Sequence, residues 1–179
     1  MSRHLGKPAC EDEMAAHLPK LVELHCTGAN AAKNAEHCME FRYVDADLMR
    51  LRAQRLVERG DRAPKGSAEA LADYERGGSL YFELFQTHCQ DPVGGAPHAE
   101  RCDEIAYNAA RAFQAARLVA RAISARRALL AFDERTRASS PLARKAVYEI
   151  GASYQAIAVY DQAAAFFERY ARIDPRAEN

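Results

Sequence analysis

Three of the five cysteines directly follow a histidine, and this pairing raises the question of metal binding. The pairs are His25-Cys26, His37-Cys38 and His88-Cys89. Neutral imidazole and thiolate are ligands that zinc prefers. However, no two cysteines have the C-x2-C spacing of a zinc site, and neighbouring side chains on a helix point about 100° apart. We therefore expect no bound metal and no cofactor.

The cysteine positions favour disulfide bonds instead. Cys89 and Cys102 lie at the end of one predicted helix and the start of the next, and Cys26 and Cys38 flank a predicted turn. Antiparallel packing brings such ends within the Cα–Cα range of roughly 4.4–6.8 Å that a disulfide requires. The sequence therefore predicts the bonds Cys26–Cys38 and Cys89–Cys102.

The fifth cysteine and the two predicted bonds together bear on location. Cys10 is the odd thiol, because a helix of 16 residues would hold it about 24 Å from Cys26. Bonds that staple turns are typical of an oxidising compartment such as the bacterial periplasm. We therefore expect a periplasmic or otherwise extracytoplasmic protein. The alternative is a cytoplasmic protein whose five cysteines are reduced.

Acidic residues beside histidines are the only candidate catalytic pairs. Glu13 lies four residues before His17, and Glu36 and Glu40 lie close to His37. Neither group reproduces the His-Glu-x-x-His spacing of a metallohydrolase. We expect no enzyme, and a helical metal-binding or enzymatic domain that uses histidine and cysteine is the alternative function.

Composition and charge exclude further classes of protein. The 179 residues carry 25 basic and 25 acidic side chains, which argues against a dedicated nucleic-acid binder. No run of about 18 apolar residues exists that would predict a membrane span. Residues 111–145 carry nine basic and two acidic side chains, and residues 10–49 carry eight acidic and three basic ones. We interpret the basic stretch as a solvated helix face, with contact to nucleic acid or an acidic partner as the alternative.

The elements that position these residues are predicted to be helices alone. Helix formers dominate, and alternating β-branched runs are absent. Breakers divide the chain into about seven helices, with a bend or break expected at Pro19 and a turn at Gly28 and Asn30. Ser140 before Pro141 is a strong start signal. The expected helices are about 11–26, 35–58, 67–89, 104–116, 118–134, 141–156 and 160–173, with loops at 60–66 and 91–97.

Small and aromatic residues recur at fixed places between Arg144 and Pro175. With Arg144 as the first position, this segment resembles a tetratricopeptide repeat, a helix–turn–helix unit of about 34 residues. Val147 and Tyr170 depart from the family pattern. Six of its eight signature positions match, namely Ile150, Gly151, Tyr154, Ala163, Phe167 and Pro175.

A weaker copy lies 41 residues earlier, where Arg126 takes the place of the signature aromatic residue. Its matching positions are Ala109, Ala110, Phe113, Ala122 and Leu129. The resemblance implies an all-α, short right-handed α-solenoid of antiparallel helix pairs, with a compact helical bundle as the alternative. The expected division is an N-terminal helical segment at 1–34, a degenerate pair at 35–100 and two repeats at 101–179.

The same resemblance implies a site and a function. First helices of such repeats line a concave groove that holds a peptide or partner helix. The groove positions map to Tyr107, Asn108, Arg111 and Gln114 in the earlier repeat and to Lys145, Tyr148 and Gln155 in the last. Asn108 and Lys145 also match a carboxylate clamp of the family, but Glu149 stands where that clamp needs a basic residue.

The resemblance thus implies a non-catalytic interaction or scaffolding module with a protein or peptide partner, similar to repeat proteins of bacterial envelope assemblies. The remaining alternative is a segment of a larger repeat protein with a purely structural role. An apolar face is expected beyond the last repeat, where a homodimer contact or further repeats would cover it.

Overall fold

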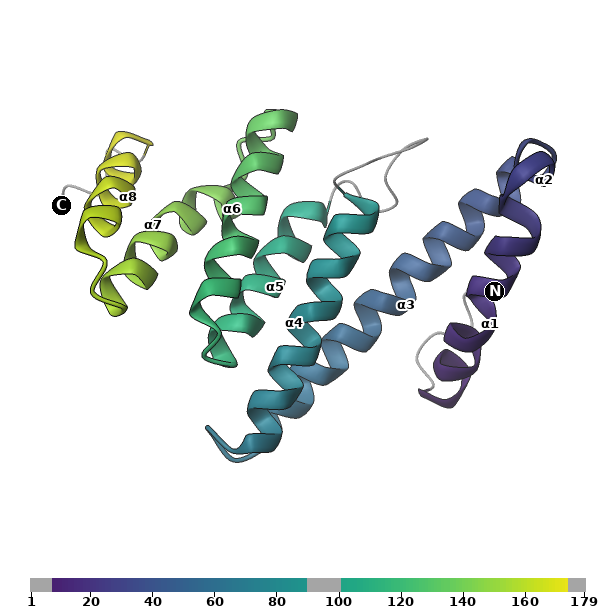
Figure 1. Ribbon diagram of the computed structural model, residues 1–179, viewed down its shortest axis with the longest axis horizontal. Helices are drawn as coiled ribbons and strands as arrows, with labels where there is room; N and C mark the ends of the chain where they lie inside the picture. The colour runs from purple at the N-terminus through teal and green to yellow at the C-terminus, as the bar shows by residue number, and fades with distance from the viewer. Residues whose placement is uncertain (1–7, 90–100, 174–179) are drawn as a thin grey trace.

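The protein is all-helical throughout the part of the chain that its computed structural model describes, residues 8–89 and 101–173. Consecutive long helices contact one another in chain order, as Figure 1 shows. The all-α prediction is confirmed, with one helix more than expected. The described residues form eight helices, namely α1 (Pro8–Cys26), α2 (Gly28–Lys33), α3 (Ala35–Arg62), α4 (Ala68–His88), α5 (Cys102–Ala115), α6 (Val119–Thr136), α7 (Pro141–Ala156) and α8 (Tyr160–Ile173).

Local capping signals correctly located several helix ends. The Ser67 hydroxyl accepts a hydrogen bond from the backbone N–H of Ala70 and caps α4. The Ser140 hydroxyl accepts one from the N–H of Leu142, and Pro141 occupies the first turn of α7. Both contacts satisfy N–H groups that have no partner inside the helix. The predicted bounds of α7 and α8 are confirmed.

Two local expectations were wrong. The turn expected at Gly28 and Asn30 is the short helix α2, which Gly28 enters with φ of 57°. The loop expected from position 60 begins later, because α3 continues through Gly60 to Arg62. At position 19, where a bend or a break was expected, α1 continues without a break. A Cβ on Gly60 would lie 2.9 Å from Cε1 of Tyr74, so the bare glycine lets that ring lie against α3. Packing between helices thus overrides the local breaker signal. The loop expected at 91–97 lies outside the described residues.

Two adjacent glycines in α4 let both neighbouring helices approach closely. A Cβ on Gly77 would lie 2.9 Å from Val57 and 3.1 Å from the backbone oxygen of Ala53, both in α3. A Cβ on Gly78 would lie 2.9 Å from the ring of Phe113 in α5. Since successive residues of a helix point about 100° apart, each glycine serves a different neighbour.

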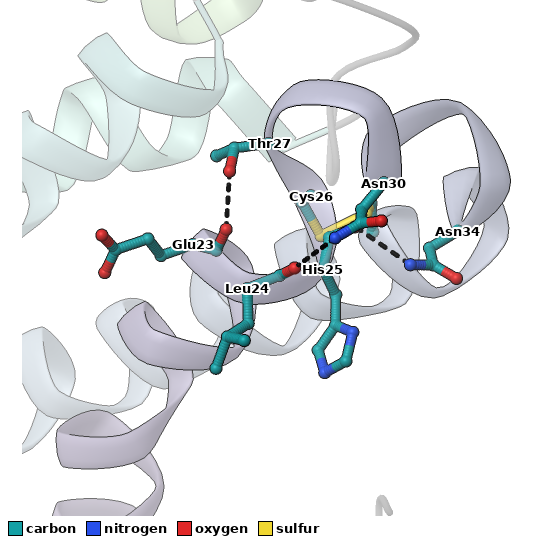
Figure 2. The surroundings of a disulfide bond; sticks show 8 residues. Glu23, Leu24, His25, Cys26, Thr27, Asn30 and Asn34 are labelled. Atoms are coloured by element: carbon teal, nitrogen blue, oxygen red, sulfur yellow. Dashed lines mark hydrogen bonds between the residues drawn. A yellow bond between two sulfur atoms is a disulfide. The ribbon is translucent and has the colours of Figure 1, made fainter.

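The two predicted cysteine pairs are at bonding distance in the structure. Cys26–Cys38, with Cα atoms 5.4 Å apart, joins the end of α1 to the first turn of α3. Figure 2 shows the Asn30 and Asn34 side-chain amides beside this bond, where they donate to backbone carbonyls at the end of α1. Cys89–Cys102, with Cα atoms 5.8 Å apart, joins α4 to α5. The Cys10 side chain lies outside the described part of the chain.

The two bonds differ in exposure to solvent. Cys89 and Cys102 are 2% and 0% exposed, whereas Cys26 and Cys38 are only half-buried. Thiol–disulfide exchange requires a thiolate to reach the sulfur.

None of the described helices has both the length and the apolar character needed to cross a membrane.

We expect a mild thiol reductant to open Cys26–Cys38 in the folded protein while Cys89–Cys102 stays bonded until the chain is unfolded. The buried bond is shielded from the attacking thiolate, and the half-exposed bond is not. Alkylation followed by peptide mass mapping, with and without denaturant, measures this order. Five alkylatable thiols in unreduced protein would contradict both pairs.

Substitutions at two glycines should differ in effect because their neighbours differ in freedom to move. Gly77→Ala should lower the free energy of unfolding by about 1–2 kcal/mol, because overpacking against the α3 backbone outweighs a helix-propensity gain of up to about 1 kcal/mol. Gly151→Ala brings a Cβ 2.8 Å from Phe167, whose half-buried ring can turn away. We expect its effect to stay within about 0.5 kcal/mol in urea unfolding. Equal effects would contradict this account.

Candidate functional site

A cleft of about 400 Å³ opens between α3 and α5, with α4 behind it. Two of the residues predicted to bind a partner, Asn108 and Arg111, line its α5 side. The side formed by α3 is mainly polar, and the side formed by α4 consists of aromatic residues. The lining residues are Arg50, Gln54, Val57, Glu58 and Asp61 from α3, Tyr74 and Tyr81 from α4, Arg101 directly before α5, and Glu104, Ile105, Asn108, Arg111, Ala112 and Ala115 from α5.

Carboxylates in the cleft are already engaged by neighbouring groups. Glu58 accepts a hydrogen bond of 2.8 Å from the Gln54 amide. Asp61 accepts one of 2.8 Å from the Tyr74 hydroxyl, and this bond raises the pKa of Tyr74 above its usual value. Arg111 is exposed and has no hydrogen bond or ion pair among the described residues. Because Gln54 and Tyr74 are neutral donors, the negative charges of Glu58 and Asp61 remain, and Arg111 is a cation without a direct ion-pair partner in a cleft that also carries carboxylates.

Beyond α5, a buried arginine fills the space that leads to α7. Arg126 of α6 is fully buried, and its Nε donates to a Glu149 carboxylate oxygen at 2.9 Å. One Nη donates to the side-chain oxygen of Gln114 in α5, and the other donates to the Ser153 hydroxyl at 3.4 Å. Each guanidinium nitrogen thus has a partner, as burial of the charge requires.

Tyr107 and Lys145 extend this network. Tyr107 is 6% exposed, and its hydroxyl donates to Glu149 at 2.8 Å. The Lys145 ammonium lies 5.4 Å from the centre of the Tyr107 ring. Burial raises the pKa of Tyr107, and hydrogen bonding to Tyr107 raises the pKa of Lys145. At neutral pH the network therefore holds a neutral phenol and a charged amine.

The structure divides the seven predicted partner-binding residues into three groups. Only Asn108 and Arg111 line the cleft, while Gln114 and Lys145 serve the network around Arg126 and Tyr107. The Tyr107 ring is largely buried where α5 packs against α7, so little of it is accessible to a partner. Tyr148 and Gln155 are exposed and lie farther along α7.

Tyr148 is half-exposed yet belongs to an aromatic cluster. Its ring centre lies 5.5 Å from that of Phe167 and 5.4 Å from that of Tyr170, both in α8. Half of the Tyr148 side chain remains open to solvent, with 50% of the residue exposed. Tyr148 therefore serves the packing of α7 against α8 and is also part of the protein surface.

Sequence reasoning missed Arg126 as a structural residue. Arg126 and Glu149 had both been noted as departures, one from the repeat pattern and one from the carboxylate clamp. The structure pairs these two departures with each other. Their opposite charges were the signal from which the pairing could have been inferred. No feature of the sequence indicated that residues of α3 would form one side of the cleft.

The histidine–cysteine pairs form no metal centre in the described residues, where no three histidine, cysteine, aspartate or glutamate side chains gather to hold an ion. Buried His88 instead lies 3.3 Å from an Asp45 carboxylate oxygen.

Comparisons of the chain with protein families, with curated proteins and with solved structures find no match.

Loss of Arg126 should destabilise the fold through the charge that it leaves behind. We expect Arg126→Met to cost about 3–5 kcal/mol in the free energy of unfolding, since Glu149 would then be largely buried without its cation. Urea unfolding followed by circular dichroism measures this cost.

The matched control is Glu149→Gln in the Arg126→Met background. Removing the stranded charge should recover part of the loss, whereas Glu149→Gln in the wild-type background should itself destabilise the fold. Additive effects of the two substitutions would contradict a direct charge pair.

Proposed function

We propose that this chain is a non-catalytic interaction or scaffolding module of tetratricopeptide type, and that it holds a peptide or partner segment in a concave groove. The observation that carries the proposal is the cleft between α3 and α5, with Asn108 and the free Arg111 on its wall. The fold in this proposal is a short right-handed α-solenoid of antiparallel helix pairs.

Contacts between helices support the solenoid. Helix α5 contacts α7 as well as its chain neighbours α4 and α6. Such contacts between alternate helices arise when helix pairs stack so that first helices adjoin. Close approach within the last pair also fits, because Ala163 is 3% exposed and Gly151 has no side chain to separate α7 from α8.

The chemistry of the cleft suits a peptide with accessible carbonyl or carboxylate oxygens. Arg111 offers planar donors without a direct ion-pair partner, and the amide of Asn108 both donates and accepts. The volume of about 400 Å³ lies within the range of about 300–1,000 Å³ for ligand pockets. A short stretch of extended peptide would fill it and would lie over the largely buried Tyr81 and Ile105.

We further propose that the module works outside the cytoplasm, as part of a bacterial envelope assembly. The two cysteine pairs support this location, because disulfides persist in oxidising compartments. The half-buried pair Cys26–Cys38 is the stronger support, because cellular thiols could reach and reduce it in a reducing compartment.

A binding screen tests the groove directly. A displayed library of random peptides is selected on the oxidised, purified chain, and the affinity of the enriched peptides is measured by fluorescence anisotropy. We expect Arg111→Ala to weaken these peptides about tenfold, which corresponds to roughly 1.4 kcal/mol. Stability should not change, because the exposed Arg111 side chain makes no contact that holds the fold.

The matched control is Arg52→Ala, which removes an exposed arginine of α3 that does not line the cleft. The Arg52→Ala variant should bind the enriched peptides with the same affinity as the wild-type protein. Equal losses in both variants would indicate general charge attraction, and unchanged affinity in Arg111→Ala would place the bound peptide elsewhere.

A further inference from the structure

Large apolar side chains are exposed mainly at one end of the molecule, around α7 and α8. Of the seven such side chains in the described residues, only Leu24 and Tyr43 lie elsewhere. Figure 1 shows α8 at the end of the row of helices, with α7 on one side and no described helix on the other. The five at this end are Tyr148, Ile157, Val159, Tyr160 and Ile173, between 39% and 66% exposed.

Helix α8 lacks the packing that its composition requires. It has 14 residues and one buried side chain, that of Ala163, whereas α5 also has 14 residues and buries eight. Phe166, Phe167 and Tyr170 are only half-buried although each is aromatic. Full burial of one such side chain stabilises a protein by about 1.5–3 kcal/mol. The described residues therefore leave the α7–α8 face incompletely covered.

The charges of α8 indicate what covers this face. Asp161 lies in the first turn and has no partner among the described residues. Arg172 lies in the last turn, is 77% exposed and makes only a weak 3.5 Å contact with Glu168 of the same helix. When two copies of such a helix run antiparallel, the acidic start of each meets the basic end of the other. The opposed helix dipoles add to this attraction.

Small side chains on α8 permit close approach. Ala164 and Ala165 are exposed and Ala171 is half-exposed, so no bulky group on these positions holds a second helix away. Tyr148 and Tyr160 project beside them and supply apolar area for contact. When the same surface of two copies is in contact, the interface is isologous, as in a two-fold dimer.

We propose that the chain forms a two-fold homodimer through the α7–α8 face, with α8 antiparallel to α8 of the second copy. Asp161 then pairs with Arg172 of the second copy, and the tyrosines pack across the axis. This interface is separate from the proposed peptide groove, because no residue that lines the cleft belongs to α7 or α8. The dimer presents two grooves, and a partner that carries two copies of its peptide would be held by avidity.

Sedimentation velocity of the full chain over a wide range of concentration, without any peptide, tests the dimer. The wild-type protein should show a reversible monomer–dimer equilibrium. Tyr160→Glu places a charge on a 66% exposed residue of the face and should raise the dimer dissociation constant at least about tenfold. The matched control Leu24→Glu, at a 63% exposed residue of α1, should leave it unchanged.

Charge reversal tests the antiparallel arrangement separately. Asp161→Arg and Arg172→Asp should each weaken the dimer, and the protein that carries both should dimerise like the wild type, since the pair is restored with its signs exchanged. Circular dichroism verifies that each variant remains helical. A wild-type protein that stays monomeric at all concentrations would overturn the proposal, as would a dimer insensitive to Tyr160→Glu. Weakening by both single reversals without restoration in the double variant would overturn the antiparallel pairing.

Discussion

The buried guanidinium of Arg126 is the interaction on which the arrangement of α5, α6 and α7 depends. Its partners come from the two helices on either side, Gln114 from α5 and Glu149 with Ser153 from α7. Separation of these helices would leave a buried charge without compensation, which is far more costly than loss of a surface ion pair. Because Tyr107 also bonds to Glu149, this part of the molecule is filled by its own side chains. The open cleft therefore lies one helix pair away, between α3 and α5.

The N-terminal end is held by a different means. Helix α1 buries only Glu11 and Leu18 in its described part, and it packs against α3. Glu11 is 0% exposed and forms a two-pronged ion pair with Arg55 of α3. Cys26–Cys38 closes the other end of α1 onto the same helix. One charge pair and one covalent bond thus take the place of the continuous apolar core that joins α3 to α7.

The sequence was a good guide wherever local chemistry decides the outcome. Ser67 and Ser140 cap helices because their hydroxyls reach N–H groups a few residues away. Gly60 misled the prediction because its role is to admit the ring of Tyr74, a contact that only the packed helices reveal. In the site, Arg111 could be placed on an exposed helix face, whereas burial of Tyr107 depends on how closely α7 approaches α5. Side-chain pairs between helices could not be predicted, because they also depend on how closely the helices approach one another.

The two glycines of α4 set the width of the groove. Gly77 brings α3 close and Gly78 brings α5 close, so the two walls of the cleft are spaced by the absence of two methyl groups. A side chain at Gly78 would press on Phe113 and move α5 outward, although position 78 does not line the cleft. The width of the cleft is thus adjustable by single substitutions that leave its lining intact. If the proposed peptide binding holds, variants with different peptide preferences are expected to arise at positions 77 and 78 as readily as among the lining residues.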